Sequence, residues 1–338
     1  MKSTSNASFS EGLAQRKGDH IELTSRAQTS ALGVDPRFNY EPLFFTHASP
    51  EDNWECTFLN HKLHMPIWVS SMTGGTGHAR TINHNLARLC GAHKLGMGLG
   101  SCRALISGHD RLEDFQVRAL MGDQPLFANL GMAQLEELVL AGKLHLVHEM
   151  VKKVEATGLI IHLNPLQEWF QPEGDRYKIS PLITLSRFLE DVNYPVIVKE
   201  VGQGMGPRSL KALLELPISA IEFGAFGGTN FSLLESLRGS SEEVKKPFIQ
   251  VGHTAEEMVE ILNSLPIGRQ EFIISGGVKS VLDGYELKMK FKAPSVIGMA
   301  SGFLAPALMS YEALETYYLN LKESWLTAKG VLNLKGEN

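Results

Sequence analysis

The feature that most constrains the fold is the eightfold recurrence of a short apolar run followed by an amphipathic segment. The apolar runs lie at 67–71, 96–100, 126–130, 159–163, 196–200, 220–224, 272–276 and 295–299. Helical patterns lie between them, at 80–91, 135–155, 181–191, 209–215 and 254–265. Strands that alternate with helices pair in parallel through right-handed crossovers. Eight such units predict an α/β fold, a closed (β/α)8 TIM barrel, with a doubly wound sheet as the competing arrangement.

The segments outside this rhythm suggest how the chain is organised. Residues 1–15 are polar and predict a flexible N-terminal tail, and residues 16–64 form an irregular N-terminal extension. The barrel is expected over 65–338, with a C-terminal helix near 311–327. A further extended piece at 248–252 interrupts the long interval between the sixth and seventh runs. We interpret that interval as an elaborated loop over the active face of the barrel.

Charge and cysteine content bound the partners and the compartment. The chain has 32 Lys and Arg against 37 Asp and Glu, a net charge of −5, which argues against nucleic acid or an anionic membrane as partner. Cys56, Cys90 and Cys102 show no metal-like spacing and suit a reducing compartment. The first 15 residues lack the apolar core of a signal peptide, and no run approaches the roughly 20 apolar residues that span a bilayer. We therefore expect a cytoplasmic protein.

The run at 159–163 leads directly into four polar side chains, His162, Asn164, Gln167 and Glu168. Strand alternation puts His162 and Asn164 on one face, and Pro165 ends the strand, so Gln167 and Glu168 are expected on the turn beyond it. Active residues of such barrels come from the C-terminal strand ends. A single carboxylate among neutral polar groups suits Mg²⁺ that is also bound by phosphate oxygens and water. A polar strand end without function, and a surface glutamate, are the competing interpretations.

Glycines and small polar residues follow the other runs. Gly276-Gly277 and Ala300-Ser301 follow the last two runs, which is the usual phosphate site of these barrels, although a glycine pair by itself is more often a tight turn. Thr229 can add a hydroxyl to the same phosphate. Together these positions predict a site for a phosphate group.

Lys199 ends an otherwise apolar run. It can pair with Glu200 or Glu222, or place positive charge beside the reduced ring of a phosphate-bearing aromatic cofactor. Asn129 and Ser101 can form hydrogen bonds to the edge of that ring, while the backbone of residues 71–73 can line the ring with hydrogen-bond donors.

A separate basic cluster, Arg16, Lys17 and His20, lies upstream of the barrel. A guanidinium, an ammonium and an imidazole together suit a diphosphate. A solvated basic patch near the end of the chain is the competing interpretation.

These strings, taken in order, resemble the type 2 isopentenyl-diphosphate isomerases, a flavin-dependent family. The resemblance covers the chain from about residue 16 to residue 308. Its motifs are RKxxHI at 16–21, SMTGG at 71–75, GS at 100–101, FANLG at 127–131, IHLNPLQE at 161–168, PEGDR at 172–176, VKEVGQGM at 198–205, GGTN at 227–230 and SGG at 275–277.

The resemblance implies a homotetrameric or homooctameric barrel that carries FMN, needs Mg²⁺, and has its flavin reduced by NADPH or NADH. It implies interconversion of isopentenyl and dimethylallyl diphosphate without net redox change. FMN contacts are implied for Ser70, Ser71, Met72, Thr73, Ser101, Asn129, Lys199, Gly224, Thr229, Gly276, Gly277, Ala300 and Ser301. Substrate contacts are implied for Arg16, Lys17, His20, Ser101, Arg103, His162, Asn164 and Gln167. Gln167 is the expected catalytic residue and Glu168 the expected Mg²⁺ ligand.

Two other functions stay open, another FMN barrel enzyme such as a 2-hydroxy-acid oxidase, and a flavin-binding protein without catalysis. The basic segment and the placement of Glu168 beside Gln167 favour a diphosphate with Mg²⁺. The chain departs from the family pattern at Glu222, where Asp is usual, at Lys279, where members vary, and after Gly330, where members often extend further.

Overall fold

The computed structural model describes residues 4–72, 78–108, 111–240 and 243–336, and it divides into two compact units. The first unit comprises Met1–Tyr40 and Asn333–Asn338. It holds α1 (Thr4–Leu23), η1 (Ala31–Gly33) and β1 (Phe38–Tyr40), and β1 pairs with β12 (Leu332–Leu334). Residues 4–15, part of the predicted flexible tail, belong to α1, while the predicted division into a tail and an extension stays a prediction.

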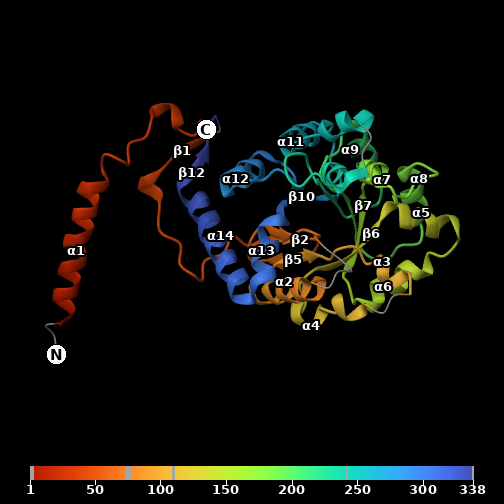
Figure 1. The fold of residues 1–338 in the computed structure, drawn as a ribbon, viewed down its shortest axis with the longest axis horizontal. Coiled ribbons are helices and arrows are strands. Elements are labelled where there is room, and N and C mark those ends of the chain that lie inside the picture. Colours follow the sequence, from red (N-terminus) through yellow and green to blue (C-terminus); the bar gives the residue numbers. More distant parts are fainter. Residues whose placement is uncertain (1–3, 73–77, 109–110, 241–242, 337–338) are drawn as a thin grey trace. The chain divides into compact units, whose positions relative to one another are not determined.

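The second unit, Glu41–Leu332, is built around a closed barrel of eight parallel strands (Figure 1). Its strands are β4 (Ile67–Val69), β5 (Gly96–Gly98), β6 (Leu126–Gly131), β7 (Gly158–Leu163), β8 (Val196–Glu200), β9 (Ala220–Glu222), β10 (Glu271–Ser275) and β11 (Ser295–Met299). They are hydrogen-bonded in the order β10-β11-β4-β5-β6-β7-β8-β9, and closure is made by β11 and β4. Each of the eight apolar runs forms one barrel strand, so the predicted (β/α)8 fold is confirmed.

Helices follow the strands and surround the barrel (Figure 1). They are α2 (Ala79–His93), α3 (Arg103–Ile106), α4 (Arg118–Met121), α5 (Met132–Leu140), α6 (His145–Lys153), α7 (Pro165–Phe170), α8 (Pro181–Leu189), α9 (Pro207–Leu214), α10 (Phe231–Glu235), α11 (Ala255–Asn263), α12 (Val281–Lys290), α13 (Ser301–Met309) and α14 (Tyr311–Val331). Shorter helical turns are η2 (Pro42–Phe44), η3 (Leu112–Asp114), η4 (Ser236–Ser240) and η5 (Glu243–Gln250).

Two predicted segments differ from the structure. The single helical pattern at 135–155 is two helices, α5 and α6, because Gly142 takes a left-handed φ of 66° that ends α5. The piece expected to be extended at 248–252 is helical as far as Gln250, in η5, where Val251 N donates to Phe248 O at 3.2 Å.

The N-terminal end of the barrel is closed by a hairpin of β2 (Cys56–Phe58) and β3 (His61–Leu63). Phe58 and Leu63 are fully buried in one cluster with Trp68 and Phe127, and the Trp68 ring meets those of Phe58 and Phe127 edge-on at 5.6 and 5.7 Å. A Cβ on Gly96 would stand 2.2 Å from the indole of Trp68. The hairpin therefore belongs with the barrel, although the sequence predicts a boundary at 64, and the open rim of the barrel is the C-terminal one.

Among the residues that the structure describes, no helix is both long enough and apolar enough to cross a membrane.

We expect Trp68→Ala to lower the free energy of unfolding by about 3–5 kcal/mol, the usual cost of emptying a buried aromatic site. Trp68→Phe keeps most of the ring contacts and should cost clearly less. Chemical denaturation followed by circular dichroism compares the two variants with the wild type. A loss below about 1 kcal/mol in Trp68→Ala would contradict the role of the indole in closing the barrel.

Candidate active site

A pocket of about 880 Å³ lies at the C-terminal ends of the barrel strands. Ten of the thirteen residues predicted for the cofactor line it: Ser70, Ser71, Met72, Lys199, Gly224, Thr229, Gly276, Gly277, Ala300 and Ser301. Lys279, the position at which family members vary, lines it as well. Thr73 lies outside the described residues. Asn129 reaches the pocket wall indirectly, since its Nδ2 donates to Ser71 Oγ at 2.9 Å.

One side of the pocket is made of glycine backbone that leaves no room for side chains. Gly276 and Gly277 have φ values of 85° and 72°, and a Cβ on Gly276 would stand 2.2 Å from Ala225 O. Gly228 is less crowded but still tight, because its Cβ would stand 3.1 Å from Gly277 N. The N-terminus of α13 begins beside them at Ser301. Bare backbone and a helix N-terminus suit the phosphate of a cofactor.

The buried pair Lys199 and Glu222 also lines the pocket. Lys199 Nζ lies 3.3 Å from Glu222 Oε1, and Ser275 Oγ donates to the same oxygen at 3.2 Å. Glu222 Oε2 and Ser70 Oγ are buried and make no hydrogen bond within the described parts of the chain. Buried polar atoms without partners are costly, so these two atoms favour a ligand with a polar edge in the pocket.

His162 is connected to the pocket through Asn129. Its Nδ1 lies 2.6 Å from Asn129 Oδ1, and because the Asn129 amide donates to Ser71, the imidazole proton is assigned to Nδ1. Burial, and then the charge of Lys199, lower the pKa of His162 from 6.5 to about 4. His162 is therefore neutral near pH 7 and offers an unprotonated Nε2, close to Gly131, as an acceptor. It does not supply positive charge to a diphosphate at that pH.

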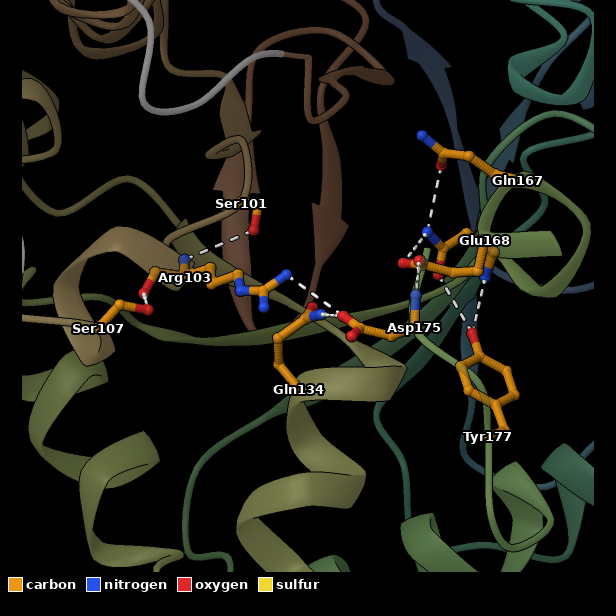
Figure 2. A network of polar contacts seen from close by, with 9 residues as sticks. Ser101, Arg103, Ser107, Gln134, Gln167, Glu168, Asp175 and Tyr177 are labelled. Carbon is orange, nitrogen blue, oxygen red and sulfur yellow. Dashed lines mark hydrogen bonds and ion pairs between the residues drawn. The ribbon is translucent and has the colours of Figure 1, made fainter. Parts of the chain in front are cut away.

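The remaining polar groups of the 159–168 segment gather at the start of α7. Pro165 is the first residue of this helix and Asn164 precedes it, so Gln167 and Glu168 lie on a helix and not on the turn that the sequence predicts. Proline suits a first helical position because the N–H that it lacks has no partner there. Asn164 Nδ2 donates to Gln167 Oε1 at 3.2 Å and to Glu168 Oε1 at 3.0 Å, which brings three predicted residues together (Figure 2).

Glu168 is held at both carboxylate oxygens. Oε1 accepts from Asn164, and Oε2 accepts from the backbone N–H of Asp175 at 2.8 Å (Figure 2). A carboxylate oxygen with one donor keeps a lone pair for a cation. Within the described ranges, no group of three or more His, Cys, Asp or Glu side chains is placed to hold a metal ion. A single carboxylate of this kind is compatible with Mg²⁺, which takes few protein carboxylates and completes its shell with phosphate oxygens and water.

Arg103 and Ser101 follow β5. Arg103 begins α3, its backbone N lies 3.5 Å from Ser101 Oγ, and its Nη1 donates to Asp175 Oδ2 at 3.3 Å (Figure 2). The Arg103 side chain is about half exposed, so its remaining donors are open to an incoming anion.

The basic cluster of Arg16, Lys17 and His20 lies on α1 in the first unit, with exposed side chains. Its assignment to a diphosphate stays a prediction.

Glu235, on α10, is a residue that the sequence patterns miss. It is 2% exposed and accepts from Gln167 Nε2 at 3.4 Å and from Gln171 Nε2 at 3.2 Å, while Arg238 Nη1 lies 2.5 Å away. The only sequence signal is the neighbouring Asn230, whose side chain caps α10. Glu235 stands well beyond a strand end, so strand-end reasoning does not reach it.

The pH dependence of stability tests the neutral, partly buried imidazole of His162. Between pH 6.5 and about 4, His162 binds a proton in the unfolded chain but not in the folded protein. The free energy of unfolding therefore falls as the pH is lowered through this interval. We expect His162→Gln to show a shallower loss than the wild type when unfolding is measured by denaturant titration between pH 7 and 4.5. Identical slopes in the two proteins would count against the lowered pKa.

Comparison with known proteins places this geometry in context. No family model matches the chain. The isopentenyl-diphosphate delta-isomerase of Rickettsia peacockii (strain Rustic) is 35% identical over 306 residues, which cover 87% of this chain and 86% of that protein. The isopentenyl-diphosphate delta-isomerase of Pseudescherichia vulneris is 35% identical over 324 residues, which cover 91% and 89%.

Solved structures of similar fold are more distant in sequence. A mandelate oxidase with a monooxide FMN adduct has a TM-score of 0.55 at 13% identity and covers 89% of this chain and 87% of its own. A putative lactate oxidase of Pediococcus acidilactici has a TM-score of 0.56 at 13% identity, covering 87% and 79%. At this identity the likeness shows the barrel fold alone.

Proposed function

The chain belongs to the isopentenyl-diphosphate delta-isomerase family, and we propose that it converts isopentenyl diphosphate into dimethylallyl diphosphate with FMN and Mg²⁺, using reduced flavin and without net redox change. One observation carries the proposal. Gln167 contacts α10, whose Phe231 and Leu234 line the pocket that holds the predicted cofactor residues. The predicted catalytic and metal-binding groups thus adjoin the predicted cofactor site.

The pocket fits FMN on the chemistry of its walls. The glycine backbone at 276–277 and the start of α13 suit the phosphate, and Lys199 offers positive charge to an electron-rich ring. Ser70 Oγ and Glu222 Oε2 are the unpartnered atoms that a polar ring edge would satisfy. Glu222, longer than the usual Asp, is accommodated because its carboxylate reaches both Lys199 and Ser275.

The substrate half of the site suits a diphosphate. Arg103 supplies a half-exposed guanidinium near Glu168, and we assign Ser101, Asn164 and Gln167 to the substrate as well. Glu168 would hold Mg²⁺, which would offset the negative charge of a diphosphate. Arg16 and Lys17 are proposed to add positive charge, and His20 a hydrogen bond, to a diphosphate.

Isomerising an allylic double bond requires a proton to be added at one carbon and removed from another. Reduced FMN, when bound, supplies that acid and base chemistry. The residues of this chain hold the substrate in place and provide a neutral, sheltered surface beside it. His162 fits such a surface, because its lowered pKa of about 4 keeps it from acting as a cationic acid near neutral pH. Gln167 is the side chain that we place nearest the reacting carbons.

Three further parts of the proposal rest on the family resemblance and on composition. They are NADPH or NADH as the flavin reductant, a homotetrameric or homooctameric assembly, and a cytoplasmic location.

The test of the proposed function is anaerobic incubation of the FMN-loaded protein with Mg²⁺, reductant and isopentenyl diphosphate. We expect dimethylallyl diphosphate to form without an electron acceptor, and a chelator to abolish its formation. Absence of the product would refute the proposal. Product formation that depends on an electron acceptor would favour an FMN oxidase instead.

Gln167→Ala should lower turnover by about a hundredfold, the usual scale for losing a positioned polar group in an active site, while FMN content stays near that of the wild type. Gln171→Ala is the matched control, because Gln171 also donates to Glu235 but stands at the end of α7. It should retain turnover within about threefold. Near wild-type turnover in Gln167→Ala would sink the catalytic assignment. FMN binding with no turnover in the wild type would suit a flavin-binding protein without catalysis.

A further inference from the structure

We propose that Asp175 is a positioning residue, which holds the guanidinium of Arg103 and the carboxylate of Glu168 in one fixed arrangement. A diphosphate and its metal ion would then meet a preassembled pair of partners. This inference rests on the proposed function, since it concerns how that same substrate would be held.

Asp175 faces both partners at once, through different atoms. Its Oδ2 accepts from Arg103 Nη1 at 3.3 Å and from Gln134 Nε2 at 2.9 Å. Its backbone N–H donates to Glu168 Oε2 at 2.8 Å. Figure 2 shows the side chain of Asp175 directed toward Arg103 and Gln134 while its backbone meets Glu168. Asp175 thus joins the group from α3 to the group from α7.

The loop that carries Asp175 is itself tied down on both sides. Glu136 on α5 accepts from the backbone N–H of Lys178 at 2.7 Å and of Ile179 at 3.2 Å. Before Asp175, Gly174 packs against α7 so tightly that a Cβ there would stand 1.9 Å from Glu168 O.

Two side chains of the same loop add bonds to the start of α7. Tyr177 OH donates to Asn164 Oδ1 at 3.1 Å, and Arg176 Nη1 donates to Glu168 O at 2.6 Å. The position of Asp175 is therefore set by the fold and not by the flexible side chain that it holds.

Arg103 needs such a partner. It stands at the start of a four-residue helix, its side chain is about half exposed, and a free arginine loses rotamer freedom when it binds an anion. The contact with Asp175 uses Nη1, which leaves Nη2 and Nε for phosphate oxygens. Gln134, 9% exposed, holds the same Asp175 oxygen in place.

The negative charge of the Asp175 carboxylate also repels a diphosphate. Removal of the carboxylate could therefore change the affinity for diphosphate in either direction. If repulsion dominates, removal of the carboxylate tightens binding. If positioning dominates, removal weakens binding, and the effect disappears once Arg103 is absent. A double-mutant cycle separates these cases, because residues that act through each other give non-additive changes.

The experiment is calorimetric titration of the FMN-loaded full chain with inorganic pyrophosphate in the presence of Mg²⁺. We expect Asp175→Ala to raise the Kd about fivefold, the scale of a partly exposed ion pair, and Asp175→Asn to raise it about twofold because the amide oxygen still accepts. In an Arg103→Ala background, Asp175→Ala should change the Kd by less than about twofold. With isopentenyl diphosphate, Asp175→Ala should raise KM while kcat stays within about twofold.

The matched control is Glu173→Gln. Glu173 lies on the same loop and pairs with Arg238 at 2.9 Å, with side chains 60% and 50% exposed, against 44% and 55% for Asp175 and Arg103. Its pyrophosphate Kd should stay within about twofold of the wild type. Thermal unfolding and FMN content show whether each variant is folded. If Asp175→Ala does not fold, the Kd of Asp175→Asn, which preserves size, is compared with that of the wild type instead.

Unchanged or tighter pyrophosphate binding in both Asp175 variants would overturn the inference while the proposed function stands. Equal effects of Asp175→Ala with and without Arg103 would overturn it as well. Failure of the wild type to bind pyrophosphate with Mg²⁺ would overturn the diphosphate site itself, and the inference with it.

Discussion

Parallel pairing of eight strands into a closed ring is the constraint on which the rest of the structure depends. Because all the strands run the same way, the residues that follow them meet at one rim, whatever their distance along the chain. Ser70 after β4, Lys199 near the end of β8 and Gly276 after β10 thereby line one pocket. The β2–β3 hairpin closes the other end with apolar side chains. The polar residues of the site therefore lie at the C-terminal rim.

The rim divides into two halves of different electrostatic character. The cofactor half contains a buried cation, Lys199, beside a buried carboxylate and bare glycine backbone. The half around α7 joins side-chain amides and a tyrosine hydroxyl to the carboxylates of Glu168, Asp175 and Glu235. His162 lies between them, and the charge of Lys199 adds to burial in keeping it neutral. Lys199 is balanced by Glu222, whereas Arg103 keeps donors open to an incoming anion.

The strands and the cofactor pocket follow from the sequence because they rest on local patterns. A buried parallel strand is a continuous apolar run, and glycine is required wherever two loop backbones touch, as at Gly276. The contacts of Asp175 and Glu235 could not be predicted this way, since each is made by a segment outside the strand ends and depends on how loops pack. The sequence predicts a turn after Pro165 where the structure has a helix, because proline ends a strand and begins a helix equally well.

The ring is closed by β4 and β11, whose register pairs Ile67 with Ile297. These two strands lie at opposite ends of the barrel sequence, so the growing chain must be almost complete before the closing pair can form. Until then β4 presents an unpaired strand edge, and loop-closure entropy opposes the contact. Folding of this protein is accordingly expected to be slow and most exposed to aggregation until β11 is available to pair with β4.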